Sequence, residues 1–250
     1  CVPKQELISN NPFILLENSK PWVIAHGGAK DLFPENTMVA FEGAITYNVD
    51  ALEMDIKLTA DNILITHHDD EIDRMSDGEG KVNDYTFEEL KKFNFGYDFE
   101  DLNGNRPYQN IKVEVTSLES LMVKYTEIPM IIEIKDQEDL GKNAADLLMS
   151  MIEKYGRKEN TIIASFHDEI IDYILSKEND FLVSTAEGEA RKMVISTKTG
   201  FGIFYKPNAM AVQLPMESSG LNLAKKRVVK SAHRHNMAVH YWTIDDKDDM

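Results

Sequence analysis

Short apolar runs alternate with amphipathic stretches along most of the chain. The runs have the length and β-branched composition of strands, and the stretches between them repeat apolar positions at helical spacing. The expected strands are residues 22–26, 51–59, 63–68, 129–135, 161–166, 181–186, 209–215 and 238–244. The expected helices are residues 34–48, 86–93, 117–125, 139–155, 168–177, 187–196 and 222–236.

The length of the links separates one hairpin from a series of crossovers. Only a few polar residues join residues 51–59 to residues 63–68, whereas a parallel crossover needs about a dozen residues or more. These two runs are therefore expected to form a β-hairpin with Asp61 and Asn62 at its tip. The remaining strands are each followed by helical sequence, which predicts parallel strands with helices outside them.

The number of repeated units indicates the fold class. Counting the first strand of the hairpin but not its return strand gives seven βα units. We therefore expect an α/β fold of the (β/α)8 TIM-barrel class, with a last strand beyond residue 250. An open doubly wound sheet is the alternative, but no Gly-rich phosphate loop follows any strand. Residues 69–116 interrupt the alternation and are expected to be an inserted segment with one short helix and no core of its own.

Composition and charge narrow the class of protein. The 250 residues are 42% hydrophobic, which is ordinary for a globular protein. We expect one barrel domain over residues 21–250, preceded by a tether of residues 1–20. The formal net charge of −16 and the lack of a basic stripe exclude nucleic acid as an expected partner. We infer no obligate protein partner.

The only cysteine is Cys1, so no disulfide can form within the chain. A cysteine at this position fits a lipoprotein cleaved just before a lipid-bearing cysteine, which would tether the protein to a membrane surface outside the cytoplasm. The alternative is that the sequence simply begins here, and a cytoplasmic location would then be expected.

Acidic side chains recur at the carboxyl ends of two strands, where a TIM barrel carries its active site. Glu53 and Asp55 are two residues apart and so share one face of a strand, and Glu133 and Lys135 repeat the arrangement. Three converging carboxylates repel one another unless a positive charge lies between them. A hard divalent cation, Mg²⁺ or Ca²⁺, prefers such oxygen ligands. Lys135 is expected to bind a phosphate oxygen beside it.

Two histidines are placed to flank this cluster. His26 ends the first strand, and the return strand of the hairpin ends at His67 and His68. Histidines on two sides of an ester suit general acid and general base catalysis near neutral pH. The alternation of the strand favours His68 for this role and His67 for packing. Gln213 and Trp242, at the ends of later strands, are candidates for substrate contacts.

At these residues the sequence resembles the glycerophosphodiester phosphodiesterase family. The matching motifs include AHGG (25–28), PENT (34–37), LEMDIKLTADN (52–62), HHDDEIDRMSDGEG (67–80), IEIK (132–135) and WTIDD (242–246). The resemblance implies a PI-PLC-like barrel that hydrolyses glycerophosphodiesters to sn-glycerol 3-phosphate and an alcohol. Its expected metal ligands are Glu53, Asp55 and Glu133, and its phosphate ligand is Lys135. His26 and His68 are its expected acid and base, in either order.

The chain departs from the resemblance at one motif, and two other functions stay open. The family often has His-Arg-Gly where this chain has His26-Gly27-Gly28, and an arginine there would add a phosphate contact. A phospholipase D-like or lysophospholipase D activity would need an apolar mouth, which the aromatic residues within 200–210 and Trp242 could provide. A non-catalytic surface binding protein is expected to lack a metal carboxylate or a histidine, and none is lacking. The acidic net charge favours a zwitterionic diester substrate, such as one with choline.

Overall fold

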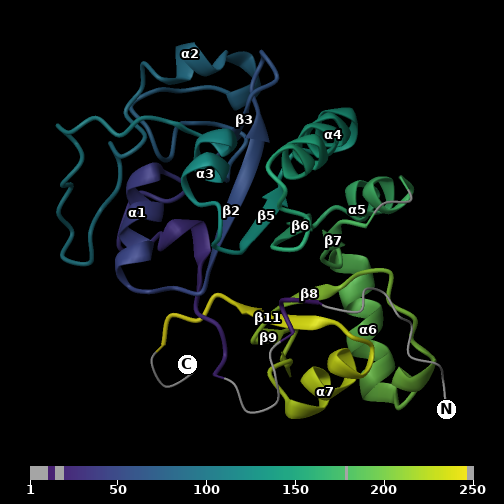
Figure 1. Ribbon diagram of the computed structural model, residues 1–250. Helices are drawn as coiled ribbons and strands as arrows, with labels where there is room; N and C mark the ends of the chain where they lie inside the picture. Colours follow the sequence, from purple (N-terminus) through teal and green to yellow (C-terminus); the bar gives the residue numbers. More distant parts are fainter. Residues whose placement is uncertain (1–10, 15–19, 178–179, 247–250) are drawn as a thin grey trace. The chain divides into compact units, whose positions relative to one another are not determined.

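The computed structural model describes residues 11–14, 20–177 and 180–246. The chain divides into two compact units, and Figure 1 labels their helices and strands. The N-terminal unit is Trp22–Thr161, and the C-terminal unit combines Cys1–Pro21 with Ile162–Met250. Cys1 and most of the expected tether lie outside the described residues, and each unit is treated separately below.

The N-terminal unit is built around β2 (Ala51–Leu58), all of whose residues are buried. β2 pairs in parallel with β1 (Ile24–Ala25) and β5 (Met130–Ile134). It pairs antiparallel with β3 (Leu64–Thr66), so the predicted hairpin is confirmed. β3 in turn pairs antiparallel with β4, Thr116–Ser117. Asn62 at the hairpin tip has a left-handed φ of 60°, a conformation that asparagine tolerates better than most residues.

The helices of the N-terminal unit are α1 (Met38–Thr46), α2 (Phe87–Leu90), α3 (Leu118–Lys124) and α4 (Glu138–Lys154), with 3-10 turns η1 (His26–Gly28) and η2 (Val82–Asp84).

Helix α1 begins four residues later than the sequence predicts. Thr37 has extended backbone and its hydroxyl accepts a hydrogen bond from the Ala40 amide, which fixes the start of the helix. Asn36 before it has a left-handed φ of 56°. Residues 34–37 therefore lie outside the helix, and Asn36 among them contacts the site described below.

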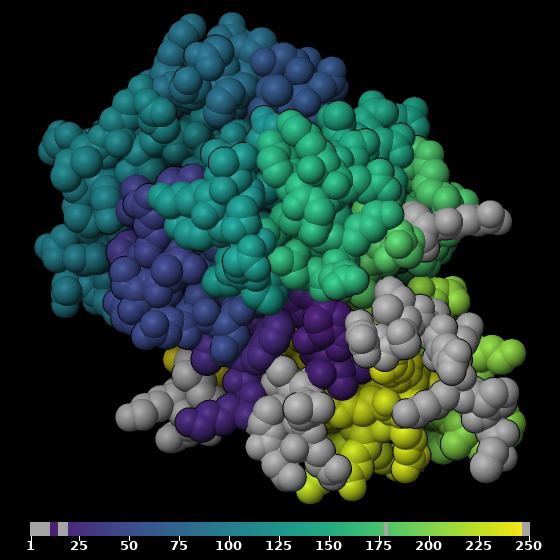
Figure 2. Space-filling model, in the orientation of Figure 1, coloured from purple at the N-terminus to yellow at the C-terminus, as the bar shows by residue number. Residues whose placement is uncertain are grey.

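The inserted segment has an apolar cluster, which the sequence did not predict. Ile65 of β3 packs with five buried residues of the insertion: Ile72, Val82, Leu90, Phe95 and Val115. The segment covers a large area of the view in Figure 2, where it is coloured blue to teal. Its short helix α2 is stabilised by a capping box between Thr86 and Glu89. The insertion is therefore an ordered layer over β3 and not an extended loop.

The C-terminal unit contains two parallel strand pairs. β6 (Thr161–Ala164) pairs with β7 (Leu182–Val183), and β8 (Ala211–Pro215) pairs with β11 (Ala238–Trp242). The helices are α5 (Asp168–Leu175), α6 (Glu187–Thr199) and α7 (Lys226–Arg234), with the turn η3 (Gly202–Phe204). A buried cluster that includes Met193, Val212, Val228 and Met237 joins α6, α7 and the β8 region.

Two short strands, β9 (Glu217–Ser218) and β10 (Leu221–Asn222), form a hairpin that the sequence did not predict. Strands of two residues are too short for hydrophobic alternation to reveal. Because β10 includes Asn222, the first residue of the expected helix, α7 begins at Lys226 and not at residue 222.

The seven strands expected to carry the barrel are all present, as β1, β2, β5, β6, β7, β8 and β11. Within the described residues, none of the helices is long and apolar enough to span a membrane.

Candidate active site

Three carboxylates meet on the neighbouring strands β2 and β5. The parallel register places Asp55 directly beside Glu133, and Glu53 lies on the same face as Asp55, two residues earlier. One carboxylate oxygen from each residue lies within 4.8 Å of the other two. The three side chains are buried, and Asp55 is only 2% exposed. The structure therefore brings together the three residues that the sequence singled out as metal ligands.

The charge of this cluster is poorly compensated by the protein alone. Burial raises the pKa of Glu53 well above its ordinary value of 4.5, and the charge of Asp55 raises it further. The Gly27 amide donates a hydrogen bond of 2.8 Å to Glu53 and acts in the opposite direction. Burial also raises the pKa of Glu133. Buried carboxylate oxygens that repel one another fit a hard divalent cation.

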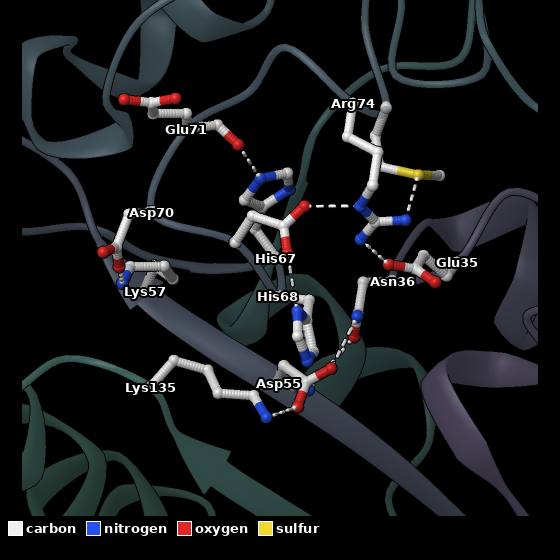
Figure 3. Close-up of polar contacts among 12 residues, drawn as sticks. Glu35, Asn36, Asp55, Lys57, His67, His68, Asp70, Glu71, Arg74 and Lys135 are labelled. Carbon is white, nitrogen blue, oxygen red and sulfur yellow. Dashed lines mark hydrogen bonds and ion pairs between the residues drawn. The ribbon is translucent and has the colours of Figure 1, made fainter.

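Lys135 is the positive charge nearest to the cluster. Its Nζ lies 2.7 Å from Glu133 Oε1 and 3.0 Å from Asp55 Oδ1, and Figure 3 shows the contact with Asp55. Burial by itself would lower the pKa of Lys135, but the two carboxylates outweigh it and raise the pKa. Lys135 is thus fully charged at neutral pH and lies where an anionic ligand of the cluster would bind.

Asn36 fixes the orientation of Asp55. Its side-chain amide donates to Asp55 Oδ2 at 2.9 Å, and its carbonyl oxygen accepts from the Asp55 amide at 3.0 Å (Figure 3). The Thr66 hydroxyl donates to the Asn36 backbone carbonyl at 2.7 Å and ties this loop to the hairpin. The sequence analysis gave Asn36 no role. The PENT motif (34–37), which contains Asn36, was the feature of the sequence that could have indicated a role for it.

Lys57 continues the row of buried charges on β2. It is 4% exposed, and its Nζ lies 2.5 Å from Asp70 Oδ1 and 2.9 Å from Asp136 Oδ1 (Figure 3 shows the former). The other oxygen of Asp136 accepts from the Leu58 amide. Lys57 was missed by the sequence analysis, although it stands two residues after Asp55 and so shares its face. Through these two ion pairs, Lys57 holds the loop after β3 and the loop after β5 close to the carboxylates.

His26 lies at the edge of the acidic cluster. Its Nε2 is 3.9 Å from Glu53 Oε2. Burial lowers the pKa of His26, and the positive charge of nearby Lys30 lowers it further. The turn η1 that carries it is tight, because a side chain at Gly28 would come within 2.9 Å of the Phe41 ring.

The two histidines after β3 have different surroundings. His67 is buried, with Nε2 3.0 Å from the Glu71 carbonyl oxygen and its ring edge-on to Phe95. The His68 side chain is 46% exposed, and its Nδ1 lies 2.7 Å from Asp69 Oδ1. His67 is therefore held in the interior by its contacts, whereas the side chain of His68 is partly open to solvent.

A chain of charged contacts holds Asp69 against His68. Arg74 Nε donates to Asp69 Oδ2 at 2.5 Å, and Arg74 also pairs with Glu35, as Figure 3 shows. Burial would raise the pKa of Asp69, but hydrogen bonds from Arg74 and His68 outweigh it and lower the pKa. Neither Asp69 nor Arg74 was given a role by the sequence analysis. Their contacts link the loop of His68 to the loop that follows His26.

Gln213 and Trp242 belong to the C-terminal unit. Gln213 lies on β8 opposite His240 of β11. Trp242 ends β11, is 36% exposed, and stands edge-on to the Phe166 ring with 5.7 Å between centroids. Their roles in substrate binding stay predictions.

Solved structures show the fold class, which is a TIM-barrel-like α/β fold. A glycerophosphoryl diester phosphodiesterase domain from Mycobacterium tuberculosis matches with a TM-score of 0.78 at 16% identity, over 88% of this chain and 87% of that one. A phosphodiesterase from Oleispira antarctica, solved with the product sn-glycerol-3-phosphate, matches with a TM-score of 0.70 at 18% identity, over 91% of this chain and 86% of that one.

Sequence comparison gives the family. The chain belongs to the glycerophosphoryl diester phosphodiesterase family, whose model matches residues 26–250. It is similar to a glycerophosphodiester phosphodiesterase from Caldanaerobacter subterraneus subsp. tengcongensis, with 31% identity over 92% of this chain and 88% of the relative. A Bacillus subtilis glycerophosphodiester phosphodiesterase is 26% identical over 94% of this chain and 80% of the relative. The protein is thus an enzyme of the phosphoric diester hydrolase class, as the sequence predicted.

Proposed function

We propose that this protein hydrolyses small glycerophosphodiesters to sn-glycerol 3-phosphate and an alcohol, with one divalent cation held by Glu53, Asp55 and Glu133. The observation that supports this most strongly is the buried carboxylate cluster, whose ligand atoms lie within 4.8 Å of one another. The product bound in the Oleispira antarctica structure supports the choice of product.

The carboxylates and Lys135 prepare the site for a phosphodiester. When bound, a Mg²⁺ or Ca²⁺ ion would polarise the diester and offset the charge that develops on its oxygens. Glu53, Asp55 and Glu133 would hold that ion, and Asn36 keeps Asp55 in place through two hydrogen bonds. Lys135 is charged and adjacent to two of the carboxylates, so it is positioned to bind a phosphate oxygen.

The two histidines would move the protons. The lowered pKa of His26 keeps its ring neutral near pH 7, and a neutral imidazole accepts a proton from the attacking nucleophile. That nucleophile is either water or the neighbouring glycerol hydroxyl; in the second case water then opens the cyclic phosphate to give sn-glycerol 3-phosphate. Asp69 accepts a hydrogen bond from Nδ1 of His68 and leaves Nε2 toward the ligand. His68 would then give a proton to the leaving alcohol oxygen as the bond between that oxygen and phosphorus breaks.

The test measures release of sn-glycerol 3-phosphate from glycerophosphocholine, with Mg²⁺ or Ca²⁺ added and with EDTA. The wild-type protein should form product only with a cation. Glu133→Gln should form none, and the control Glu127→Gln, at an exposed position, should match the wild type. Release of choline from lysophosphatidylcholine without glycerol 3-phosphate would favour a lysophospholipase D-like reaction. No product from either substrate with either cation would favour a non-catalytic binding protein.

A further inference from the structure

Three exposed apolar side chains follow the last turn of α6 in the C-terminal unit. Phe201, Ile203 and Phe204 are 63%, 54% and 68% exposed, and the two phenylalanine rings lie 6.4 Å apart between centroids. These three residues are termed the aromatic loop. Isolated exposed apolar residues are normal on a protein surface, but a group of large ones indicates a surface that binds something.

The folded contacts of the C-terminal unit fix the outward orientation of this loop. Gly200 ends α6 with a left-handed φ of 88°. The Gly202 carbonyl oxygen is hydrogen-bonded to His235 Nε2 at 2.8 Å, and the Tyr205 ring stands edge-on to the His235 ring. A Cβ added at Gly202 would lie 3.2 Å from Ser231 Oγ, so the loop packs closely on α7. The aromatic loop is therefore presented by a well-packed turn.

The sequence on both sides of the loop is rich in basic residues, in contrast to the charge of the whole chain. Residues 190–236 contain nine lysines and arginines and one acidic residue, whereas the net charge of the chain is −16. Arg227 and Arg234 stand four residues before and three residues after Ser231, on the side of α7 that contacts the loop. Lys206 is two residues after Phe204. These three side chains are exposed, and the ion pairs found among the described residues do not involve them.

The N-terminal segment enters at the same end of the C-terminal unit. The Asn11 side chain donates to the Met210 carbonyl oxygen at 2.8 Å and to the Asn236 carbonyl oxygen at 3.4 Å. Met210 precedes β8, as the aromatic loop does, and Asn236 is next to His235, which holds the loop.

We propose that the aromatic loop, with Lys206, Arg227 and Arg234 around it, docks the protein on the surface of an anionic lipid bilayer. Aromatic and aliphatic side chains insert at the boundary between headgroups and acyl chains, and nearby basic side chains are attracted by anionic headgroups. The acidic remainder of the molecule is repelled by the same membrane, so electrostatics alone favours approach with this face. The docking is independent of the hydrolytic chemistry proposed above.

The experiment measures co-sedimentation with phosphatidylcholine vesicles, with and without phosphatidylglycerol. The protein carries Cys1→Ser, so no lipid or disulfide at that position contributes. We expect binding to the vesicles with phosphatidylglycerol, weakened by added salt. The double variants Phe201→Ser/Phe204→Ser and Arg227→Glu/Arg234→Glu should each bind at least about tenfold more weakly, because one removes the inserted rings and the other reverses the attraction.

Two matched control pairs lie in the inserted segment of the N-terminal unit. Leu102→Ser/Ile111→Ser removes two apolar side chains that are 76% and 61% exposed, and Lys92→Glu/Lys112→Glu makes the same change of net charge as the arginine pair. Both should bind like the wild type. Absence of binding to anionic vesicles would overturn the proposal, and so would binding that the loop variants leave unchanged.

Hydrolysis of soluble glycerophosphocholine separates the docking from the proposed function. Both loop variants should keep wild-type turnover, because none of the substituted residues is among the groups proposed for catalysis. Weakened vesicle binding with full turnover supports docking. Vesicle binding that depends on the loop, in a protein that hydrolyses neither substrate, would refute the proposed reaction and leave the docking standing.

Discussion

The two units of the molecule differ in whether their charged side chains are buried or exposed. The N-terminal unit buries charged side chains: Glu53, Asp55, Lys57, Glu133, Asp136 and Arg157. Among the described residues of the C-terminal unit, the buried polar side chains are uncharged: they are Asn11 and several serines and threonines, such as Ser184 and Thr197. Its basic side chains lie on the surface instead. Burying charge is costly unless each charge is paired or used, so we expect the reaction to depend most on the buried charges of the N-terminal unit.

The largest effect expected from this comparison concerns the two histidines of the N-terminal unit. His26→Ala and His68→Ala should each lower kcat for glycerophosphocholine by about 10³-fold, in the range typical of general acid–base catalysis. If His68 protonates the leaving group, its loss should matter much less, on the order of tenfold, for a p-nitrophenyl ester, because p-nitrophenolate leaves without a proton. His26→Ala should be equally impaired on both esters.

The control for these measurements is His233→Ala, which changes an exposed histidine of the C-terminal unit and should leave turnover unaltered. Equal losses for His68→Ala on the two esters would remove His68 from the role of general acid. Unchanged turnover in His26→Ala would remove that histidine from the mechanism.

The sequence revealed the pattern of the sheet and most of the N-terminal site. Alternation placed Glu53, Asp55, Glu133 and Lys135 on common faces, and link length identified the hairpin. These features are local, because a period of two or a short loop can be read within a dozen residues.

Partners that are distant in sequence could not be predicted in the same way. Asn36 bonds Asp55 across 19 positions, and the Leu58 amide bonds Asp136 across 78. Periodicity tells which face a side chain lies on, but the partner on that face depends on how loops fold over it. The left-handed φ of Asn36 likewise leaves no periodic signal.

A second, smaller effect concerns the stability of the N-terminal unit without a cation. The pKa values of Glu53 and Glu133 are raised in the folded state, so the folded state binds more protons than the unfolded state. Their contribution to stability is present at low pH and is lost as pH rises above 4.5 toward the raised values. A cation at a hundred times its Kd should restore about 2.7 kcal/mol.

Urea unfolding at several pH values, with and without Mg²⁺ or Ca²⁺, measures this effect. Glu53→Gln should be less sensitive to pH without a cation and should gain less from one, because it has lost a charged ligand. Glu127→Gln serves again as the control. A wild-type protein whose unfolding is indifferent to both cations would contradict the ligand assignment.

The smallest effect expected has the opposite sign and belongs to the C-terminal unit. His240 on β11 packs against Phe13 with its Nδ1 shielded from solvent, and burial lowers its pKa from 6.5 to about 4. The folded state therefore binds fewer protons, and stability present above pH 6.5 is lost as pH falls toward about 4. The full shift corresponds to about 3 kcal/mol, and the partial exposure of the ring reduces this to roughly 1–2 kcal/mol. His240→Phe should remove this loss of stability in acid, while His233→Phe, at an exposed position, should change it less.

Hydrogen exchange followed separately for the amides of β2 and of β11 tests both units in one experiment. Without a cation, acidification should stabilise the N-terminal unit and destabilise the C-terminal unit. Exchange from the folded state should therefore become slower in β2 relative to β11. The same acid response in both strands would show that the units do not differ in the way they bury charge.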